Sequence, residues 1–487
     1  MSRKLVFRFL VAATISWAGW AAWSLTGSGN DVTVTVIDDV GLPINGAQVH
    51  GGESLLGVTG NDGRLQIAWS PSLTMLTVSA TGYSPLEMTM LDEPAAALEA
   101  VLRANLLRGR VLDHEENPVA GAYISAGTAT AVSDEEGRFT VRKAEPGTIE
   151  VWRPAWDGNT ISWNGGLGEE MISIAPQVKK AVHVGGEAAR DNWDFFVELA
   201  NNTEINSLMI DLKDETGLIF YLSQVAIAQE MGATVDYYDL PSLAAEAEEQ
   251  GIYLIGRVVA FQDPLAAIRS PEMAVWDTEL NEPYAAGGQY FLDPTDPAAQ
   301  AYALELGVEA CKAGVDEIQF DYVRFPDSRP DSARFDGGVS EEVRTPTIRD
   351  FLATAVAQLH PLGCAVAADI FGFLTKAIDD GGIGQRWEDL TEVLDVASPM
   401  VYPSHYASGW GGFTNPNDYP AETVADALDD GLERLTRQTV VRPWLQDFGY
   451  TPDQVRAQIE EAESRGLGWM LWNAQSNVTV EALRPDG

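Results

Sequence analysis

The stretch Glu317-Ile-Gln-Phe-Asp-Tyr-Val-Arg-Phe-Pro326 decides the fold of this chain. Its first half is typical of a buried strand, and its second half supplies an acid, two aromatic residues, an arginine and a proline that stops the strand. In a barrel of parallel strands, residues at the carboxyl ends of the strands face the reaction cleft. Asp321 is therefore the first candidate for chemistry. The alternative is a structural role, as a loop cap or as the partner of Arg324.

Apolar runs that end in polar or aromatic clusters recur along the second half of the chain. With the opening stretch and Lys180–Gly185 they number eight, the others being 207–211, 252–261, 365–370, 396–402, 439–444 and 468–473. Segments with helical periodicity lie between them. Strand and helix alternating over about 300 residues predict a (β/α)8 TIM barrel at 171–487. A doubly wound open sheet would also alternate, but it usually carries a glycine-rich phosphate loop, which the sequence lacks.

The composition excludes one class of partner. Acidic residues outnumber basic residues by 72 to 31, which gives a formal net charge of −41. The phosphates of a nucleic acid would be repelled by such a chain, so we expect no nucleic acid partner. The excess acid is spread over the whole sequence, and we interpret it as a solvated surface.

Residues 1–28 combine a basic lead-in with the apolar run 9–26. This pattern predicts either an export signal or an uncleaved membrane anchor, and it is where we expect any membrane contact. We therefore expect a protein that is secreted or anchored in the cell envelope. Cys311 and Cys364 are expected to be two buried thiols. A disulfide is the alternative, because a sequence does not give the distance between them.

An internal repeat precedes the predicted barrel. The two copies correspond at Asp38–Val49 and Asp113–Ile124, and again at Val58–Leu65 and Val132–Phe139. Both alternate apolar and polar residues between turn-forming residues, which predicts small β-sandwiches at 31–104 and 105–170. Their Pro-x-x-Gly-Ala and Gly-Arg motifs resemble the carboxypeptidase regulatory-like domain, an immunoglobulin-like module. This resemblance implies a fold and says little about function, because such modules act as spacers, docking units or sugar binders.

The strand ends of the predicted barrel carry carboxylates together with Trp and Tyr. This mixture favours a glycoside hydrolase, in which one acid protonates the leaving oxygen, another attacks or stabilises the oxocarbenium-like centre, and rings stack on sugars. The substrate would be a carbohydrate. Besides Asp321 and Asp369, the candidates for contact with it are Asp211, Lys213, Asp214, Tyr322, Arg324, Tyr402, His405, Trp444, Asp447, Trp472 and Asn473.

Other kinds of active site lack their motifs. The sequence has no His-Glu-x-x-His, no Gly-x-Ser-x-Gly and no cysteine-histidine metal set, and we predict no cofactor. His405 more often binds a substrate hydroxyl or a nearby acid than a metal. A divalent ion held by Asp211, Asp214 and Asp369 stays open, because carboxylate sites for hard cations leave little trace in spacing.

Six ordered motifs across residues 175–485 resemble the family described as "putative glycoside hydrolase domain", formerly a domain of unknown function. The motifs are Asp211–Gly217, Phe320–Pro326, Asp369–Gly372, Ser398–Tyr406, Arg442–Asp447 and Gly468–Asn473. The family resemblance implies a TIM barrel. Related barrels place the nucleophile at the end of strand four and the general acid at the end of strand five or six.

That placement implies Asp321 as nucleophile or charge stabiliser and Asp369 as general acid/base, with Asp447 as a reserve acid. Many related barrels have Glu on strand five, where this chain has the shorter Asp. The alternative for Asp369 is a helix N-cap. Two short carboxylates on adjacent strands would lie roughly 5–5.5 Å apart and favour retention of anomeric configuration.

We therefore expect an exported or anchored glycosidase whose β modules precede a catalytic barrel. The rival is a barrel that binds polysaccharide without turnover. A metal-dependent hydrolase is the third hypothesis.

Overall fold

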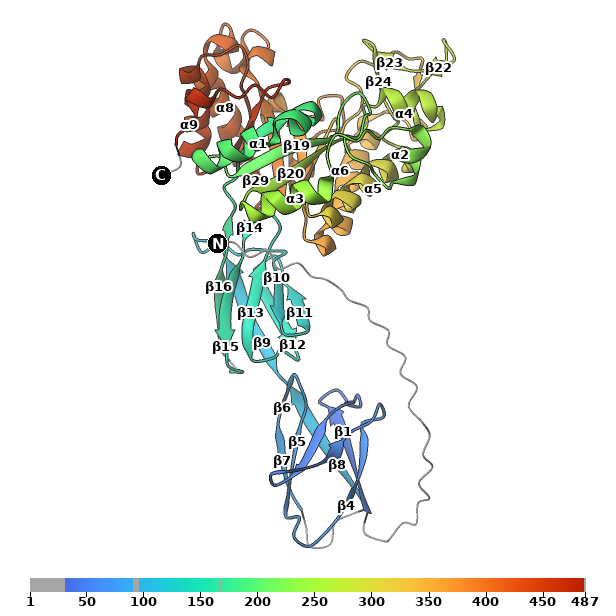
Figure 1. Ribbon diagram of the computed structural model, residues 1–487, viewed down its shortest axis with the longest axis vertical. Coiled ribbons are helices and arrows are strands. Elements are labelled where there is room, and N and C mark those ends of the chain that lie inside the picture. The colour runs from blue at the N-terminus through green and yellow to red at the C-terminus, as the bar shows by residue number, and fades with distance from the viewer. Residues whose placement is uncertain (1–30, 91–95, 167, 486–487) are drawn as a thin grey trace. The chain divides into compact units, whose positions relative to one another are not determined.

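The computed structural model describes residues 31–90, 96–166 and 168–485. They form two compact units, one ending at Pro176 and the other beginning at Gln177 (Figure 1). The export signal or anchor expected at 1–28 lies outside the described residues. No helix within the described ranges is long and apolar enough to cross a membrane.

The unit before Gln177 is all-β, as the turn-rich repeat predicted. Its strands are β1 (Asp31–Asp38), β2 (Gln48–Gly51), β3 (Ser54–Val58), β4 (Arg64–Ala68), β5 (Met75–Ser79), β6 (Tyr83–Ser84), β7 (Leu86–Thr89), β8 (Ala97–Ala104), β9 (Leu106–Leu112), β10 (Tyr123–Ala126), β11 (Ala129–Val132), β12 (Arg138–Arg142), β13 (Gly147–Trp152), β14 (Trp156–Asp157), β15 (Asn159–Trp163), β16 (Glu169–Ser173) and β17 (Ala175–Pro176). The larger sheets have the orders β4-β1-β8-β6, β3-β2-β5-β7, β12-β9-β16 and β11-β10-β13-β15. In β1 the period-two alternation buries Val32, Val34 and Val36.

The two copies of the repeat share a hydrogen-bonding device. In the first, Thr59 Oγ1 donates to the Ile44 carbonyl at 2.6 Å and accepts the Ala47 N–H at 2.9 Å. In the second, Ser133 Oγ makes the corresponding bonds, donating to Val119 and accepting from Ala122. Strand β16 pairs with β9 of the second copy and spans Glu169–Ser173, so the predicted boundary at residue 170 falls inside it.

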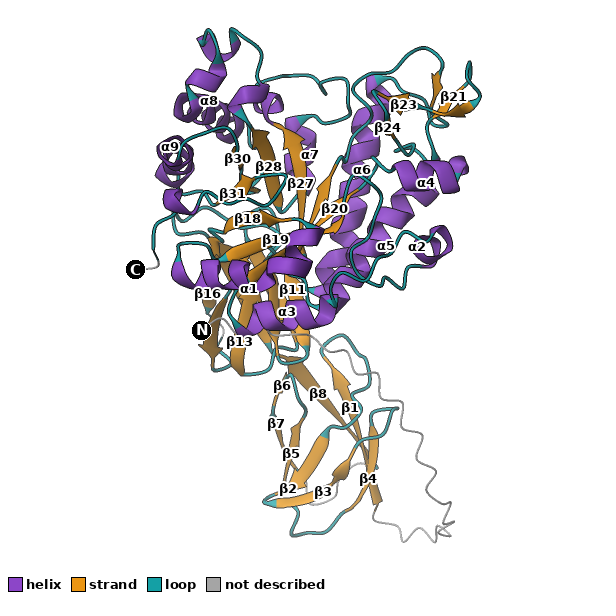
Figure 2. Ribbon diagram, turned by 45° about the horizontal axis from the view of Figure 1, so that its top comes forward, coloured by secondary structure: helices purple, strands orange, loops and turns teal. Residues whose placement is uncertain are grey.

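The second unit is a closed barrel of eight parallel strands, the seventh of which is interrupted (Figure 2). The strands are β18 (Lys180–Val184), β19 (Ser207–Lys213), β20 (Tyr253–Val259), β25 (Glu317–Asp321), β27 (Ala365–Phe371), β28 (Val396–Val401), β29 with β30 (Val440–Val441, Trp444–Gln446) and β31 (Trp469–Trp472). The pairing of β18 with β31 and of β27 with β28 closes the ring. The barrel predicted from the alternation is therefore confirmed.

Within the described residues, seven helices pack on the barrel strands: α1 (Gly186–Asn202), α3 (Leu240–Glu249), α5 (Pro297–Ala313), α6 (Glu341–Leu359), α7 (Trp387–Val393), α8 (Pro420–Glu433) and α9 (Pro452–Ser464). The short helices α2 (Ala226–Met231) and α4 (Pro264–Arg269) lie in connections and contact one another. Short strands in the connections are β21 (Trp276–Asp277), β22 (Glu282–Pro283), β23 (Ala285–Ala286), β24 (Gln289–Tyr290) and β26 (Ala333–Arg334). The 3-10 turns are η1 (Pro271–Met273), η2 (His360–Leu362), η3 (Gly372–Thr375), η4 (Pro403–His405), η5 (Trp410–Gly412), η6 (Pro416–Asp418) and η7 (Val480–Ala482). Local signals fix the helix ends. Asp296 caps α5 through its side chain, and Thr451 with Gln454 forms a capping box at α9.

Strand β25 divides its side chains between two environments. Ile318 and Phe320 belong to the layer between strands and helices, where Phe320 meets Phe351 of α6 with ring centroids 5.2 Å apart. Glu317, Gln319 and Asp321 have the opposite parity and point into the barrel. The strand therefore delivers a column of polar groups to the barrel interior, from its amino end to its carboxyl end.

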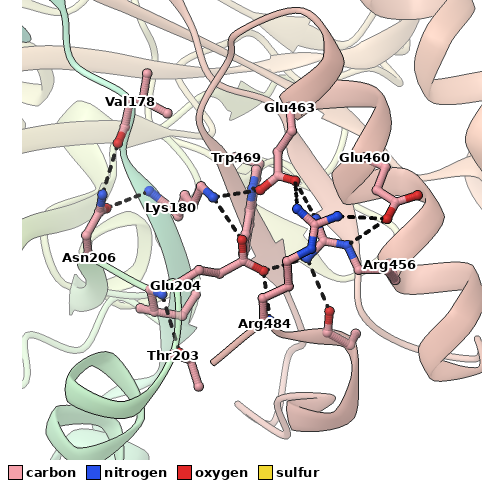
Figure 3. A network of polar contacts seen from close by, with 12 residues as sticks. Val178, Lys180, Thr203, Glu204, Asn206, Arg456, Glu460, Glu463, Trp469 and Arg484 are labelled. Carbon is pink, nitrogen blue, oxygen red and sulfur yellow. Dashed lines mark hydrogen bonds and ion pairs between the residues drawn. The ribbon is translucent and has the colours of Figure 1, made fainter. Parts of the chain in front are cut away.

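A network of ion pairs joins the first barrel strand to α9, the helix before the last strand (Figure 3). Lys180, at the start of β18, binds Glu204 at 2.8 Å and Glu463 of α9 at 2.6 Å. Arg456 of α9 contacts both of those acids, and Arg484 near the end of the chain binds Glu463 at 3.1 Å. The network joins the two ends of the barrel sequence.

The expectation of two buried thiols was wrong. Cys311 of α5 and Cys364, which precedes β27, form a disulfide with their Cα atoms 6.0 Å apart. Because α5 packs beside β25 and the chain then returns through α6 to β27, the fold brings together two residues that are 53 positions apart.

Candidate active site

A cleft of about 560 Å³ opens at the carboxyl ends of the barrel strands. Its lining combines acids and one arginine with a large share of aromatic rings. The lining residues are Glu215, Arg257, Asp321, Tyr322, Asp369, Phe371, Gly372, Phe373, Met400, Tyr402, His405, Tyr406, Ala407, Trp410, Trp444 and Trp472. Both predicted catalytic acids are among them.

Asp321 is held by the buried guanidinium of Arg257. Arg257 Nη2 lies 2.6 Å and Nε 3.0 Å from Asp321 Oδ2, and the backbone N–H of Tyr322 donates to Asp321 Oδ1 at 2.6 Å. Tyr322 adopts the left-handed region with a φ of 47°, which ends the strand and turns its amide back to the carboxylate. These charge-assisted hydrogen bonds fix the orientation of the Asp321 carboxyl group.

Arg257 is itself held from behind by Asp211. Arg257 Nη1 donates to Asp211 Oδ1 at 2.8 Å, and His183 Nε2 lies 3.1 Å from Asp211 Oδ2. Burial alone would raise the pKa of Asp211, but the charges of His183 and Arg257 outweigh it and lower that pKa to about 2. Asp211 is 6% exposed and does not line the cleft. It orients Arg257 rather than meeting a ligand.

Asp369 lies in a different environment from Asp321. It is 2% exposed, and its Oδ1 accepts hydrogen bonds from Trp444 Nε1 at 2.6 Å and from Gln319 Nε2. Burial and the nearby negative charge of Asp321 raise the pKa of Asp369 well above its usual range. Asp369 lies within β27, so it is not the helix N-cap that was the alternative to a catalytic role.

Aromatic rings line the cleft in two groups. In one, Trp472 and Trp444 meet edge to face with centroids 5.3 Å apart. In the other, Phe373 and Tyr406 pack around Trp410, at 6.4 and 5.5 Å. Such rings can stack on the apolar faces of sugar rings.

Glycine is required where these loops cross. A Cβ on Gly372 would lie 2.3 Å from the Tyr406 hydroxyl and 2.4 Å from the Met400 carbonyl oxygen. The last residue of the Asp369–Gly372 motif therefore allows the loops after β27 and β28 to approach closely.

His405 and Tyr402 line the same cleft. Their rings meet edge to face at 5.3 Å, and burial lowers the pKa of the His405 imidazole. Burial also raises the pKa of Tyr402 well above its usual range, and it raises that of Tyr322 to about 12. The two phenols therefore stay protonated near neutral pH and can act as hydrogen-bond donors.

Six residues predicted to contact substrate do not line the cleft: Asp211, described above, and five others. Lys213 is buried against Asp263 at 2.9 Å, and Asp214 accepts from Thr216 in its own turn. Arg324 packs on a ring of the cleft lining, with its guanidinium 4.9 Å from the centre of the Phe371 ring. Asp447 and Asn473 fix loops: Asp447 Oδ2 accepts the Thr479 N–H at 3.0 Å, and Asn473 Nδ2 donates to the Asp447 carbonyl at 2.7 Å.

Four residues that the sequence did not single out complete the site: Glu215, Arg257, Gln319 and His183. Glu215 stands at the rim, with its side chain 45% exposed and its carboxylate 3.4 Å from Arg257. The signal for Arg257 was a lone charge inside an apolar strand, which a buried site requires to be paired. The three acids considered as a metal site do not form one, and the described residues contain no cluster of three or more metal-ligating side chains.

Several solved structures are similar to this chain. A hypothetical protein from Ruminiclostridium thermocellum is 33% identical over 39% of this chain and 96% of its own, with a TM-score of 0.35. The glycoside hydrolase domain of PgaB (BpsB) from Bordetella bronchiseptica is 13% identical over 62% of this chain and 95% of its own, with a TM-score of 0.45. That of PelA from Pseudomonas aeruginosa is 14% identical over 62% and 98%, with a TM-score of 0.37.

No curated protein shows significant similarity to this chain. The family model described as "Putative glycosyl hydrolase domain" matches residues 181–478, which is more than half of the sequence and nearly the whole barrel. The chain belongs to this glycosyl hydrolase-like family.

Proposed function

We propose that this protein is an exported glycoside hydrolase that cleaves a polysaccharide or oligosaccharide with Asp321 and Asp369. The observation that carries the proposal is the contrast between two carboxyl groups in one cleft. Asp321 is bound by Arg257, whereas Asp369 is buried and its pKa is raised by burial and by Asp321. Two carboxyl groups with opposite protonation states are what glycoside hydrolysis requires.

In this mechanism Asp369 is the general acid. Both hydrogen bonds that Asp369 receives fall on Oδ1, from Trp444 and Gln319. A protonated carboxyl group accepts at its carbonyl oxygen, so the proton is on Oδ2. Asp369 gives this proton to the glycosidic oxygen as the C–O bond breaks, and the bonding electron pair stays on the leaving oxygen.

Asp321 acts on the other side of the bond. Its carboxylate attacks the anomeric carbon, and the ionised Asp369 then removes a proton from the water that hydrolyses the glycosyl-enzyme. Phe320 and Ala368 are paired neighbours in β25 and β27, and each catalytic acid follows one of them. Asp321 and Asp369 therefore occupy corresponding positions on adjacent strands, and this placement supports retention of anomeric configuration.

The aromatic rings of the cleft support a carbohydrate as the substrate, and the disulfide supports export. A disulfide persists in oxidising compartments such as a periplasm or the extracellular space. Residues 1–28 would direct the chain there or anchor it. The two β units predicted at 31–104 and 105–170, the second extended to take in all of β16, would be immunoglobulin-like modules of the carboxypeptidase regulatory-like type, linking that segment to the barrel.

The test is hydrolysis of a glycan panel by the full chain, with new reducing ends as the measurement. Proton NMR of the first product gives its anomeric configuration. We expect turnover of at least one neutral or amino-sugar polymer, with retention. If the protein binds glycans but hydrolyses none of them, it is a carbohydrate-binding barrel and not an enzyme. If the first product has inverted configuration, Asp321 is not the nucleophile.

A further inference from the structure

We propose that His183 is a positioning residue for both candidate catalytic acids, and that it does this as a doubly protonated imidazolium. The inference rests on the proposed function for its catalytic consequence but not for the protonation state. His183 lies in β18, is 3% exposed and does not line the cleft, so it acts through its neighbours.

The protonation state follows from what each ring nitrogen faces. His183 Nδ1 lies 2.8 Å from the backbone carbonyl oxygen of Asn473, which can only accept a hydrogen bond. Nε2 lies 3.1 Å from Oδ2 of Asp211. The other oxygen of this carboxyl group accepts from the buried guanidinium of Arg257 at 2.8 Å, a partner that favours a carboxylate, so Oδ2 also accepts. Either neutral tautomer would turn a nitrogen lone pair towards one of these oxygens, and only the imidazolium donates to both.

The first connection from His183 leads to Asp321. The imidazolium holds Oδ2 of Asp211, and the other oxygen of that carboxylate receives Arg257 Nη1 at 2.8 Å. Arg257 in turn donates twice to Asp321. The position of the guanidinium against Asp321 therefore depends on a carboxylate whose second oxygen is fixed by His183.

The second connection leads to Asp369. The His183 ring stacks on Trp472 with centroids 4.2 Å apart and an interplanar angle of 27°. Trp472 meets Trp444 edge to face, and the Trp444 indole N–H donates to Asp369 Oδ1. That hydrogen bond selects the oxygen that carries no proton, so the orientation of the acid depends on the same packed stack.

The charges support this assignment. The imidazolium and the Arg257 guanidinium face two buried carboxylates, those of Asp211 and Asp321, whereas Glu215, the third acid beside Arg257, is 45% exposed and screened by water. Burial raises the pKa of the nearby Asp369, which favours its neutral form. A neutral His183 would leave one buried positive charge against two negative ones. The burial of that uncompensated charge would be costly, because the low-dielectric interior of the barrel screens it weakly.

The protonation state can be measured without a substrate. In the 15N-histidine-labelled full chain, proton-detected NMR at pH 7 reports how many ring nitrogens of each of the five histidines carry a proton. The His183→Gln variant assigns the signal by its disappearance. We expect both nitrogens of His183 to carry protons. A single protonated nitrogen would overturn the assignment, whether or not the chain proves to hydrolyse a glycan.

Two substitutions separate the two hydrogen bonds. The amide nitrogen of His183→Gln takes the place of Nε2 and can still donate to Asp211, whereas that of His183→Asn takes the place of Nδ1 and can donate only to Asn473. Neither carries the positive charge. We expect His183→Asn to lower kcat by roughly 10- to 100-fold with little change in KM, and His183→Gln to recover part of the loss.

A matched control is His360→Gln, because Nε2 of His360 binds Asp395 at 2.7 Å at the opposite end of the barrel. We expect its kcat to equal that of the wild type. Crystal structures of the two His183 variants add a readout that needs no turnover: Arg257 should stay on Asp321 in the Gln variant and move from it in the Asn variant. An unmoved Arg257, or a wild-type kcat in folded His183→Asn, would overturn the positioning role.

Discussion

Strand β25 carries an acid at each end, and each acid binds a buried arginine. At the amino end Glu317 pairs with Arg442 and accepts the Tyr253 hydroxyl at 3.1 Å. At the carboxyl end Asp321 pairs with Arg257. Glu317 is completely buried, whereas Asp321 borders the cleft. The same pair of chemical groups thus lies in the packed interior at one end of the strand and at the candidate active site at the other.

The difference shows that a buried ion pair is not by itself evidence of a site. What distinguishes Arg257 is the number of acids around it: Asp211, Asp321 and the rim residue Glu215. What distinguishes Asp321 is a second carboxyl group, Asp369, that shares its cleft and whose pKa is raised by burial and by Asp321. The amino end should therefore govern stability and the carboxyl end activity.

The largest effect is expected at Asp321. The Asp321→Asn variant keeps the size of the side chain but removes the charge that attacks or stabilises the anomeric centre. We expect its kcat to fall by on the order of 10³-fold or more. Initial rates on the best glycan of the panel measure this, with circular dichroism to show an intact fold. Wild-type rates in this variant would remove Asp321 from the mechanism.

At the other end of the strand, Glu317→Gln should lower stability and leave chemistry alone. It leaves the Arg442 charge buried without its partner, and breaking such a pair costs about 3–5 kcal/mol. Urea unfolding of the barrel gives the change in free energy, and kcat of the folded protein is the control. A large loss of kcat at unchanged stability would contradict the division between the two ends.

The disulfide also lies at the amino end, where Cys364 precedes β27. Removing it with Cys311→Ser and Cys364→Ser together should lower the free energy of unfolding by about 2–4 kcal/mol, with kcat unchanged. A reductant should lower the melting temperature of the wild type and not that of the double variant. Equal melting temperatures for the oxidised wild type and the double variant would show that the cross-link adds no stability.

In the cleft, Trp410→Ala should weaken sugar binding. The ring is only half-buried and lines the cleft, so we expect a loss of roughly 1–3 kcal/mol. Titration calorimetry with an oligosaccharide in the Asp321→Asn background avoids hydrolysis during the measurement. Trp193→Ala on α1 is a matched control outside the cleft, and it should keep full affinity. The same loss in both variants would point to a general disturbance of the fold.

The smallest effect concerns Asp369 and depends on pH. Its folded-state pKa is raised above the unfolded value of about 3.9, so both states hold the proton well below pH 4. As pH rises towards the folded pKa, only the unfolded state releases the proton, and stability falls. Asp369→Asn has no such proton. We therefore expect this inactive variant to melt at a higher temperature than the wild type at pH 7, with the difference shrinking towards pH 4. A constant difference across that range would mean that Asp369 is ionised in the folded protein.

Sequence patterns were sufficient for the barrel and for much of the cleft lining. Each strand reads as an apolar run, and the carboxyl ends of parallel strands converge, so Asp321, Asp369, Trp444 and Trp472 could be placed together before their distances were known. The spatial closeness of the two cysteines could not be predicted, because it depends on how α5 and β27 pack.

Side-chain direction explains the residues that were misplaced. Lys213 has the parity of Asp211, but the register of β19 against β20 shifts between these two residues. That irregularity turns Lys213 outwards, to Asp263 and to the Tyr302 ring of α5. Arg324 follows the left-handed Tyr322, so the alternation of the strand no longer applies to it. Glu215 comes from a loop, where no periodicity exists to indicate direction.

The column Glu317, Gln319 and Asp321 has a consequence for how this barrel could be redesigned. Gln319 donates to Asp369 from the middle of the column, so a buried ion pair, a hydrogen bond to the proposed acid and the proposed nucleophile all come from five consecutive residues. Exchanging loops around the cleft would leave all three in place. Shifting the pairing register of the whole strand by one residue would turn all three outwards at once and bring Ile318 and Phe320 into the interior. Loops are therefore the part of this protein open to redesign, and β25 has to be transferred to a new scaffold whole.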